Sequence, residues 1–117
     1  MYLRIEYYDQ NFSFASCLPR DGKVIQILKS SESDLDWYLL DLIRPILYNN
    51  SQYRHLLLAS RDKAHFIGDD KPVHVFIRLV PSENVANGFS YKQYQLVAWG
   101  IANLIPDKPL ANGLQNA

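Results

Sequence analysis

The sequence contains a single cysteine, Cys17, so it has neither an internal disulfide framework nor a cysteine-rich zinc site. A chain without disulfides suits a reducing compartment, and we therefore expect a cytoplasmic protein. No apolar run approaches the roughly 18 residues that a membrane-spanning helix needs. Residues 1–10 also lack the apolar core of a signal peptide. The sequence predicts no association with a membrane.

The chain also lacks an excess of charge, because twelve basic residues balance twelve acidic ones. Binding to nucleic acid is driven largely by neutralisation of phosphates, so a net charge of zero argues against a strongly electrostatic nucleic-acid protein. The composition of 48% hydrophobic and 21% charged residues is typical of a globular protein. For 117 residues we predict one domain over residues 1–105 and a loosely ordered tail over residues 106–117.

Motifs of common enzyme classes are missing: there is no P-loop, no G-x-G-x-x-G, no H-E-x-x-H and no G-x-S-x-G. We therefore predict a protein that is not an enzyme and that needs no cofactor. His55, His65 and His74 are separated by ten and nine residues, which matches no closed zinc motif, and no metal site is predicted. A catalytic pair of Cys17 with His74 as its base is the one enzyme hypothesis left, and it ranks last.

The N-terminal part predicts a three-stranded antiparallel meander. Residues 2–8 alternate, with Leu3 and Ile5 on one face, and this period of two indicates a half-buried strand. Turn residues at 9–11 and 19–22 separate it from predicted strands at 12–18 and 23–29.

Two later segments have apolar residues at helical spacing. In "DLDWYLLDLIRP", residues 34–45, the stripe begins at Leu35 and continues through Leu39 and Leu42, with Ser31 or Ser33 as N-cap. Pro45 is expected to end this helix. A second helix is predicted from Ser90 to about Ile105.

Between these segments the pattern is less decisive. Residues 72–80 alternate and predict a strand with Val73, Val75, Ile77 and Leu79 on one face. Residues 53–60 fit a strand or a short helix, and residues 64–68 fit a further short strand. The predicted fold is therefore α+β, an antiparallel sheet of four to six strands with two main helices packed on one face.

Both tryptophans fall outside the predicted helix stripes, with Trp37 among acidic residues. Full burial of a tryptophan stabilises a fold by up to about 5 kcal/mol, so something is expected to cover each ring. One interpretation is that loops, the tail or the other helix cover them. The other is that they anchor a partner protein or a second copy of the chain, since Trp and Arg dominate interface hot spots. The predicted partner-binding residues are Trp37, Tyr38, Leu40, Asp41, Arg44 and Trp99.

The first functional hypothesis is thus a small non-catalytic protein-binding domain, an inhibitor or an immunity-type protein that neutralises a partner protein. The alternative is a nucleic-acid-binding module, in which aromatic rings and arginines on the outer sheet face stack bases. The residues of that alternative face are Tyr2, Arg4, Tyr8, His74, Phe76 and Arg78. The small excess of basic residues near this face makes nucleic acid the weaker prediction.

Overall fold

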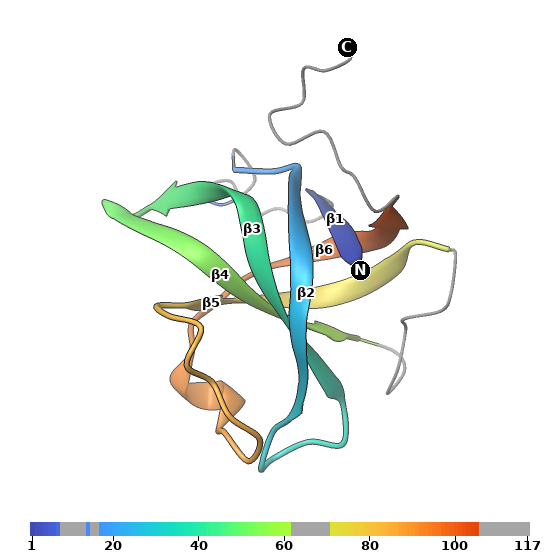
Figure 1. The fold of residues 1–117 in the computed structure, drawn as a ribbon, viewed down its shortest axis with the longest axis vertical. Coiled ribbons are helices and arrows are strands. Elements are labelled where there is room, and N and C mark those ends of the chain that lie inside the picture. The colour runs from blue at the N-terminus through green and yellow to red at the C-terminus, as the bar shows by residue number, and fades with distance from the viewer. Residues whose placement is uncertain (8–13, 15–16, 62–70, 106–117) are drawn as a thin grey trace.

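The structure, a computed structural model, describes residues 1–7, 14, 17–61 and 71–105. Its six strands form a closed antiparallel barrel in which each strand pairs with the next and the last returns to the first (Figure 1). The strands are β1 (Tyr2–Tyr7), β2 (Arg20–Lys29), β3 (Asp36–Tyr48), β4 (Ser51–Ser60), β5 (Val73–Val80) and β6 (Leu96–Ile105). A single 3-10 turn, η1 (Tyr91–Gln93), lies in the connection between β5 and β6.

The predicted α+β fold is wrong, because both predicted helices are replaced mainly by strands. Residues 34–45 lie largely in β3, and the segment 90–105 consists of η1 followed by β6. The error has a physical cause. On β3, Trp37 and Leu39 face one side of the wall and Tyr38 and Leu40 the other, yet all four are buried. A strand that is covered on both sides has apolar residues on both faces, so it lacks the polar–apolar alternation of a half-exposed strand. Its apolar residues can then also fit the spacing of an amphipathic helix.

The predicted three-stranded meander is wrong in its second strand. β1 pairs directly with β2, from Tyr2 opposite Lys23 to Ile5 opposite Arg20. Of residues 12–18, only Phe14, Cys17 and Leu18 are described, and they lie outside the strands. The predicted strand at 64–68 and the predicted tail at 106–117 lie outside the described residues.

The choice left open at 53–60 is decided, because this segment belongs to β4. The strand predicted at 72–80 is confirmed as β5, with its predicted inner face buried.

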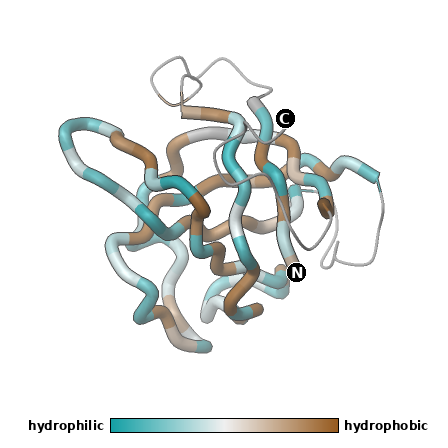
Figure 2. Tube along the Cα trace, turned by 45° about the horizontal axis from the view of Figure 1, so that its top comes forward, coloured by the Kyte–Doolittle hydropathy of each residue, from teal (hydrophilic) through white to brown (hydrophobic). Residues whose placement is uncertain are grey.

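The inward-facing residues of the strands fill the barrel. They form one buried cluster that includes Leu3, Ile5, Tyr38, Leu40, Leu42, Leu56, Leu58, Val75, Ile77 and Ala102. Figure 2 shows hydrophobic segments along the strands that wrap around this interior. Space inside is tight: a Cβ added at Gly100 on β6 would lie 2.8 Å from Ile77 Cδ1. The interior is therefore a packed core with side chains filling its lumen.

A second core lies outside the barrel, between its wall and the β5–β6 connection, residues 81–95. It contains Leu28, Trp37, Leu39, Leu57, Ala59, Val80, Val85 and Phe89. The connection is tied to the end of β2: Ser31 N donates to Phe89 O at 2.8 Å, and Gly88 N donates to Lys29 O at 2.8 Å. In Figure 1 this connection loops across the lower part of the barrel. We call this layer the outer core.

The β3–β4 hairpin turns at Asn49 and Asn50, which have φ values of 51° and 65°. Asparagine tolerates this left-handed conformation, so the pair forms the type of tight turn that antiparallel strands prefer. Pro45 lies where the β3–β4 register shifts, between Asp41 and Ile46. A proline is tolerated there because an irregular stretch requires no ladder hydrogen bond from it.

Candidate functional site

The outer core encloses a pocket of about 270 Å³, which we call the outer pocket. It is formed by residues far apart in the sequence: the β2–β3 turn, strands β3 and β5, and η1 each contribute to it. Its lining consists of Ser33, Leu35, Trp37, Phe76, Arg78 and Tyr91.

Aromatic residues make up half of the described lining. Trp37 stacks on Tyr91, with ring centroids 5.3 Å apart and an interplanar angle of 21°, and meets Phe89 edge-on at 6.1 Å. Trp37 is only 1% exposed, and its Nε1 has no hydrogen-bond partner. A buried N–H donor without an acceptor costs about 1–3 kcal/mol, so an acceptor supplied from outside would be favourable here.

Among the described residues that line the pocket, Arg78 is the only one with a charged side chain. Its Nη1 donates to Tyr94 O at 2.8 Å and to Tyr91 O at 3.2 Å, which holds the connection against β5. The guanidinium carbon lies 4.7 Å from the Tyr91 ring centroid and 5.8 Å from that of Trp37.

The guanidinium of Arg78 is incompletely satisfied. Its Nε is buried without an acceptor, and no carboxylate among the described residues forms an ion pair with it. Burial lowers the pKa of Arg78 from its ordinary value, although an arginine remains charged near neutral pH. The side chains that line the outer pocket therefore include a positive charge and two buried N–H groups that have no acceptor among the described residues.

A second aromatic group adjoins the pocket through Phe76. Phe76 meets Trp99 edge-on, with centroids 5.0 Å apart, and the Arg61 guanidinium carbon lies 4.0 Å from the Trp99 ring centroid. Trp99 and Arg61 are half-buried. The outside of β5 and β6 thus carries a partly open surface of rings and arginine beside the outer pocket.

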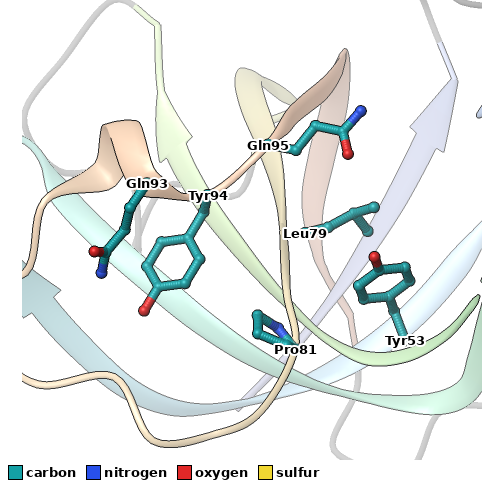
Figure 3. A pocket seen from close by; sticks show the side chains of 6 residues that line it. All are labelled: Tyr53, Leu79, Pro81, Gln93, Tyr94 and Gln95. Carbon is teal, nitrogen blue, oxygen red and sulfur yellow. The ribbon is translucent and has the colours of Figure 1, made fainter.

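A different hollow, of about 300 Å³, lies at one end of the barrel, and we call it the mouth pocket. Figure 3 shows Gln93 and Tyr94 on one side of it, with Tyr53 and Leu79 on the other. Its described lining, completed by Pro81 and Gln95, contains no charged side chain. The two pockets share the segment 91–95 as a wall but differ in electrostatic character.

The structure does not bring the six predicted partner-binding residues onto one face. Trp37 is in the outer core, whereas Tyr38 and Leu40 point into the barrel and are at most 1% exposed. Asp41 accepts from Arg54 Nε at 2.7 Å, and Arg44 is exposed and outside both pocket linings. Of the two interpretations of Trp37, the structure agrees with the one in which a loop covers the ring, because Phe89 and Tyr91 of the connection 81–95 pack against it.

The alternative face is also divided. Phe76 and Arg78 line the outer pocket, and His74 precedes them on β5. Tyr2 and Arg4 lie on β1, where Arg4 is paired with Asp21 at 2.7 Å. Tyr8 lies outside the described residues.

Three pocket residues, Ser33, Leu35 and Tyr91, were missed by sequence reasoning. Ser33 was interpreted as a helix cap and Leu35 as part of a helix stripe. The only available signal was the aromatic spacing of "FSYKQY", residues 89–94, which recurs every two to three positions.

The proposed pair of Cys17 and His74 is not formed. Cys17 belongs to the barrel interior, is 8% exposed, and its Sγ lies 3.6 Å from Leu47 O. His74 alternates with the inward-facing Val73 and Val75 and so points to the other side of the wall. Within the described ranges no three His, Cys, Asp or Glu side chains converge on a common point, and His65 lies outside those ranges.

Comparisons with protein-family models, with curated proteins and with solved structures found no match for this chain. No helix in the described part of the chain has the length and hydropathy required to cross a bilayer.

Proposed function

We propose that this protein is a small, non-catalytic binding domain that takes a protein partner, in the manner of an inhibitor or an immunity-type protein, in the cytoplasm. The outer pocket is the observation that supports this proposal. Its rings and arginine are the residue types that dominate binding energy at protein interfaces. The partner would insert a side chain between Trp37, Phe76 and Tyr91.

The size of the pocket favours this kind of ligand. At about 270 Å³ it lies below the range of roughly 300–1,000 Å³ typical of sites for drug-sized molecules. A hollow of this size accepts one or two rings or one side chain, which is the scale of an interface hot spot. The barrel interior offers no competing site, because packed side chains occupy it.

The proposal can be tested with a photo-crosslinking amino acid at two positions. At Leu35, a half-buried residue of the pocket rim, the probe would lie against any inserted group. At Leu47, which is 70% exposed on the distant β3–β4 hairpin, the same probe serves as the matched control. The source cells are irradiated, and adducts are identified by mass spectrometry.

We expect one defined protein to be crosslinked from position 35 and not from position 47. Ser33→Phe, which fills the pocket from its rim, should remove that adduct while lowering the free energy of unfolding by no more than about 1 kcal/mol, since the only hydrogen bond it removes among the described residues is the one from Leu35 N to Ser33 Oγ. Equal capture from both positions, capture that survives Ser33→Phe, or no adduct from position 35 would contradict the proposal.

A second candidate function is binding of single-stranded nucleic acid on the rings and arginines around Trp99. The edge-on contact of Phe76 with Trp99 and the position of Arg61 over Trp99 favour it. Bases stack on such rings for about 1–3 kcal/mol each. The zero net charge weighs against it, since phosphate neutralisation supplies most of the affinity.

Fluorescence anisotropy of labelled single strands at rising salt concentration tests this candidate. Binding should weaken steeply with salt, and Trp99→Ala should weaken it about tenfold or more. Absence of binding at low salt, or binding that Trp99→Ala leaves unchanged, would exclude this function.

A further inference from the structure

Arg78 forms no ion pair inside the outer pocket with any carboxylate among the described residues. Its neighbours there are rings and backbone carbonyls, and Glu32, the acidic residue close enough to act on it electrostatically, accepts a hydrogen bond from Ser90 Oγ at 2.8 Å. A partly buried cation without an ion pair favours a ligand that carries the opposite charge.

The unpaired donors point to the same ligand chemistry. Trp37 Nε1 and Arg78 Nε belong to side chains of the pocket lining, and each is buried without an acceptor among the described residues. A carboxylate has two acceptor oxygens and a phosphate has three, and hydrogen bonds to such ions are roughly twice as strong as neutral ones.

The remaining wall selects for a flat apolar group. Trp37, Phe76 and Tyr91 present three rings, and Leu35 adds an aliphatic surface. A ring that enters beside them gains offset or edge-on contacts worth about 0.5–1.5 kcal/mol beyond its buried area.

We propose that the outer pocket binds a carboxylate or phosphate group attached to an aromatic ring or a short apolar stem, with Arg78 as the residue that reads the charge. In a protein partner, this group would be a carboxylate-bearing or phosphorylated side chain or a chain terminus. The inference rests on the function proposed above and specifies what the partner presents.

The test measures binding of three small probes that share one ring: benzoate, phenyl phosphate and the neutral isostere benzamide. The protein carries Trp99→Phe, so that Trp37 is the sole indole and its fluorescence reports on the outer pocket. Benzoate or phenyl phosphate should saturate, and benzamide should bind at least about tenfold more weakly, a difference of about 1.4 kcal/mol. The stronger of the two anions identifies the carboxylate or the phosphate as the preferred group.

A matched pair of variants at the rim tests the role of charge without disturbing Arg78. Ser33 Oγ accepts a hydrogen bond from Leu35 N at 2.9 Å, and both Asp and Asn can replace this acceptor. Ser33→Asp places a competing carboxylate at the pocket and should weaken anion binding about tenfold, whereas Ser33→Asn should change it less than about twofold.

Substitutions of Arg78 then test the residue itself. Arg78→Gln should abolish the preference for benzoate over benzamide, and Arg78→Lys, which keeps the charge, should retain part of it. A third control addresses the mouth pocket, whose lining is uncharged: Gln93→Ala should leave anion binding unchanged.

Equal affinity for benzoate and benzamide, no binding of either anion, equal effects of Ser33→Asp and Ser33→Asn, or a preference that survives Arg78→Gln would each overturn the inference. Failure here is distinct from failure of the proposed function. A crosslinked partner that depends on an open outer pocket would stand even if the pocket showed no preference for anions.

Discussion

The barrel interior and the outer core both exclude solvent, but different parts of the chain enclose them. Six hydrogen-bonded strands surround the interior, whereas the connection 81–95 covers the outer core. The interior cluster is built from apolar and tyrosine side chains. The outer core also borders a partly buried arginine and an indole N–H without a partner.

This difference indicates where the molecule can accommodate a ligand. Loops open at lower free energy than central strands, because fewer ladder hydrogen bonds must break. The outer pocket lies under such a loop, and its charge and unpaired donors are costs that a ligand can relieve. We expect the packed interior to provide most of the folding free energy, which offsets the cost of the unpaired polar groups in the outer core.

The largest expected effect comes from deleting matched leucines on either side of the wall. Leu58 faces the interior and Leu57 the outer core, and both are 0% exposed on adjacent positions of β4. Leu58→Ala should lower the free energy of unfolding by about 4 kcal/mol and Leu57→Ala by about 3 kcal/mol, since the loop can partly collapse into the second cavity. Urea unfolding measures both, and a larger loss for Leu57→Ala would reverse the comparison.

Overpacking tests how rigid the interior is. A Cβ at Gly100 would lie 2.8 Å from Ile77 Cδ1 and 3.0 Å from Glu6 O, so the terminal methyl of Ile77 would have to shift and the backbone at Glu6 would have to give slightly. Gly100→Ala should cost about 2 kcal/mol in thermal or urea unfolding. Gly22→Ala, whose nearest contact would be Leu40 Cβ at 3.1 Å, should cost less. Equal costs would indicate that the interior yields more easily than its packing implies.

Arg78→Gln addresses the attachment of the outer layer. Loss of the donations to Tyr91 O and Tyr94 O should cost about 1.5 kcal/mol. The effect should be local: amide hydrogen exchange is expected to accelerate in residues 89–95 while the amides of β4 remain protected. Uniform acceleration across the barrel would show that the connection is part of the global folding unit.

The smallest effect is expected at an ion pair on the uncovered outside of the barrel. Arg4 contacts Asp21 through Nε at 2.7 Å and Nη2 at 2.9 Å, and the Arg4 side chain is 38% exposed. Arg4→Gln should cost about 1 kcal/mol, because solvent screens the Arg4 guanidinium but the Asp21 side chain, which is 9% exposed, loses its partner. A double-mutant cycle with Asp21→Asn isolates the interaction, and a coupling above about 1.5 kcal/mol would show that this wall is less exposed to solvent than its accessibility implies.

Some elements could be predicted from local pattern. In β5 the inward residues Val73, Val75, Ile77 and Leu79 alternate with more polar ones, and in β1 Leu3 and Ile5 do the same. The sequence also contains a signal for the tight turn at Asn49 and Asn50 that the prediction did not use, since paired asparagines between apolar runs are typical of hairpins.

The candidate site could be predicted only in part. Trp37, Phe76 and Arg78 were singled out as aromatic or basic residues without a place in the expected core, and the structure brings these three together. The residues that these three contact in the folded protein were not predictable from the sequence. Trp37 stacks on a tyrosine more than fifty positions away, and Tyr38 and Leu40, its sequence neighbours, point to the opposite side of the wall.

Local pattern alone was enough for β1 and β5, because their alternation depends on neighbours within a few positions, whereas the turn predicted at 19–22 is wrong, since residues 20–22 belong to β2. Closure of the barrel, the strand character of β3 and β6, and the formation of the outer pocket were decided by tertiary contacts. Once the connection covers β3, both of its faces become dry and the alternation that marks a strand disappears. The free energy that selects this arrangement comes from burying rings against residues distant in the chain, and no short window of sequence contains both partners.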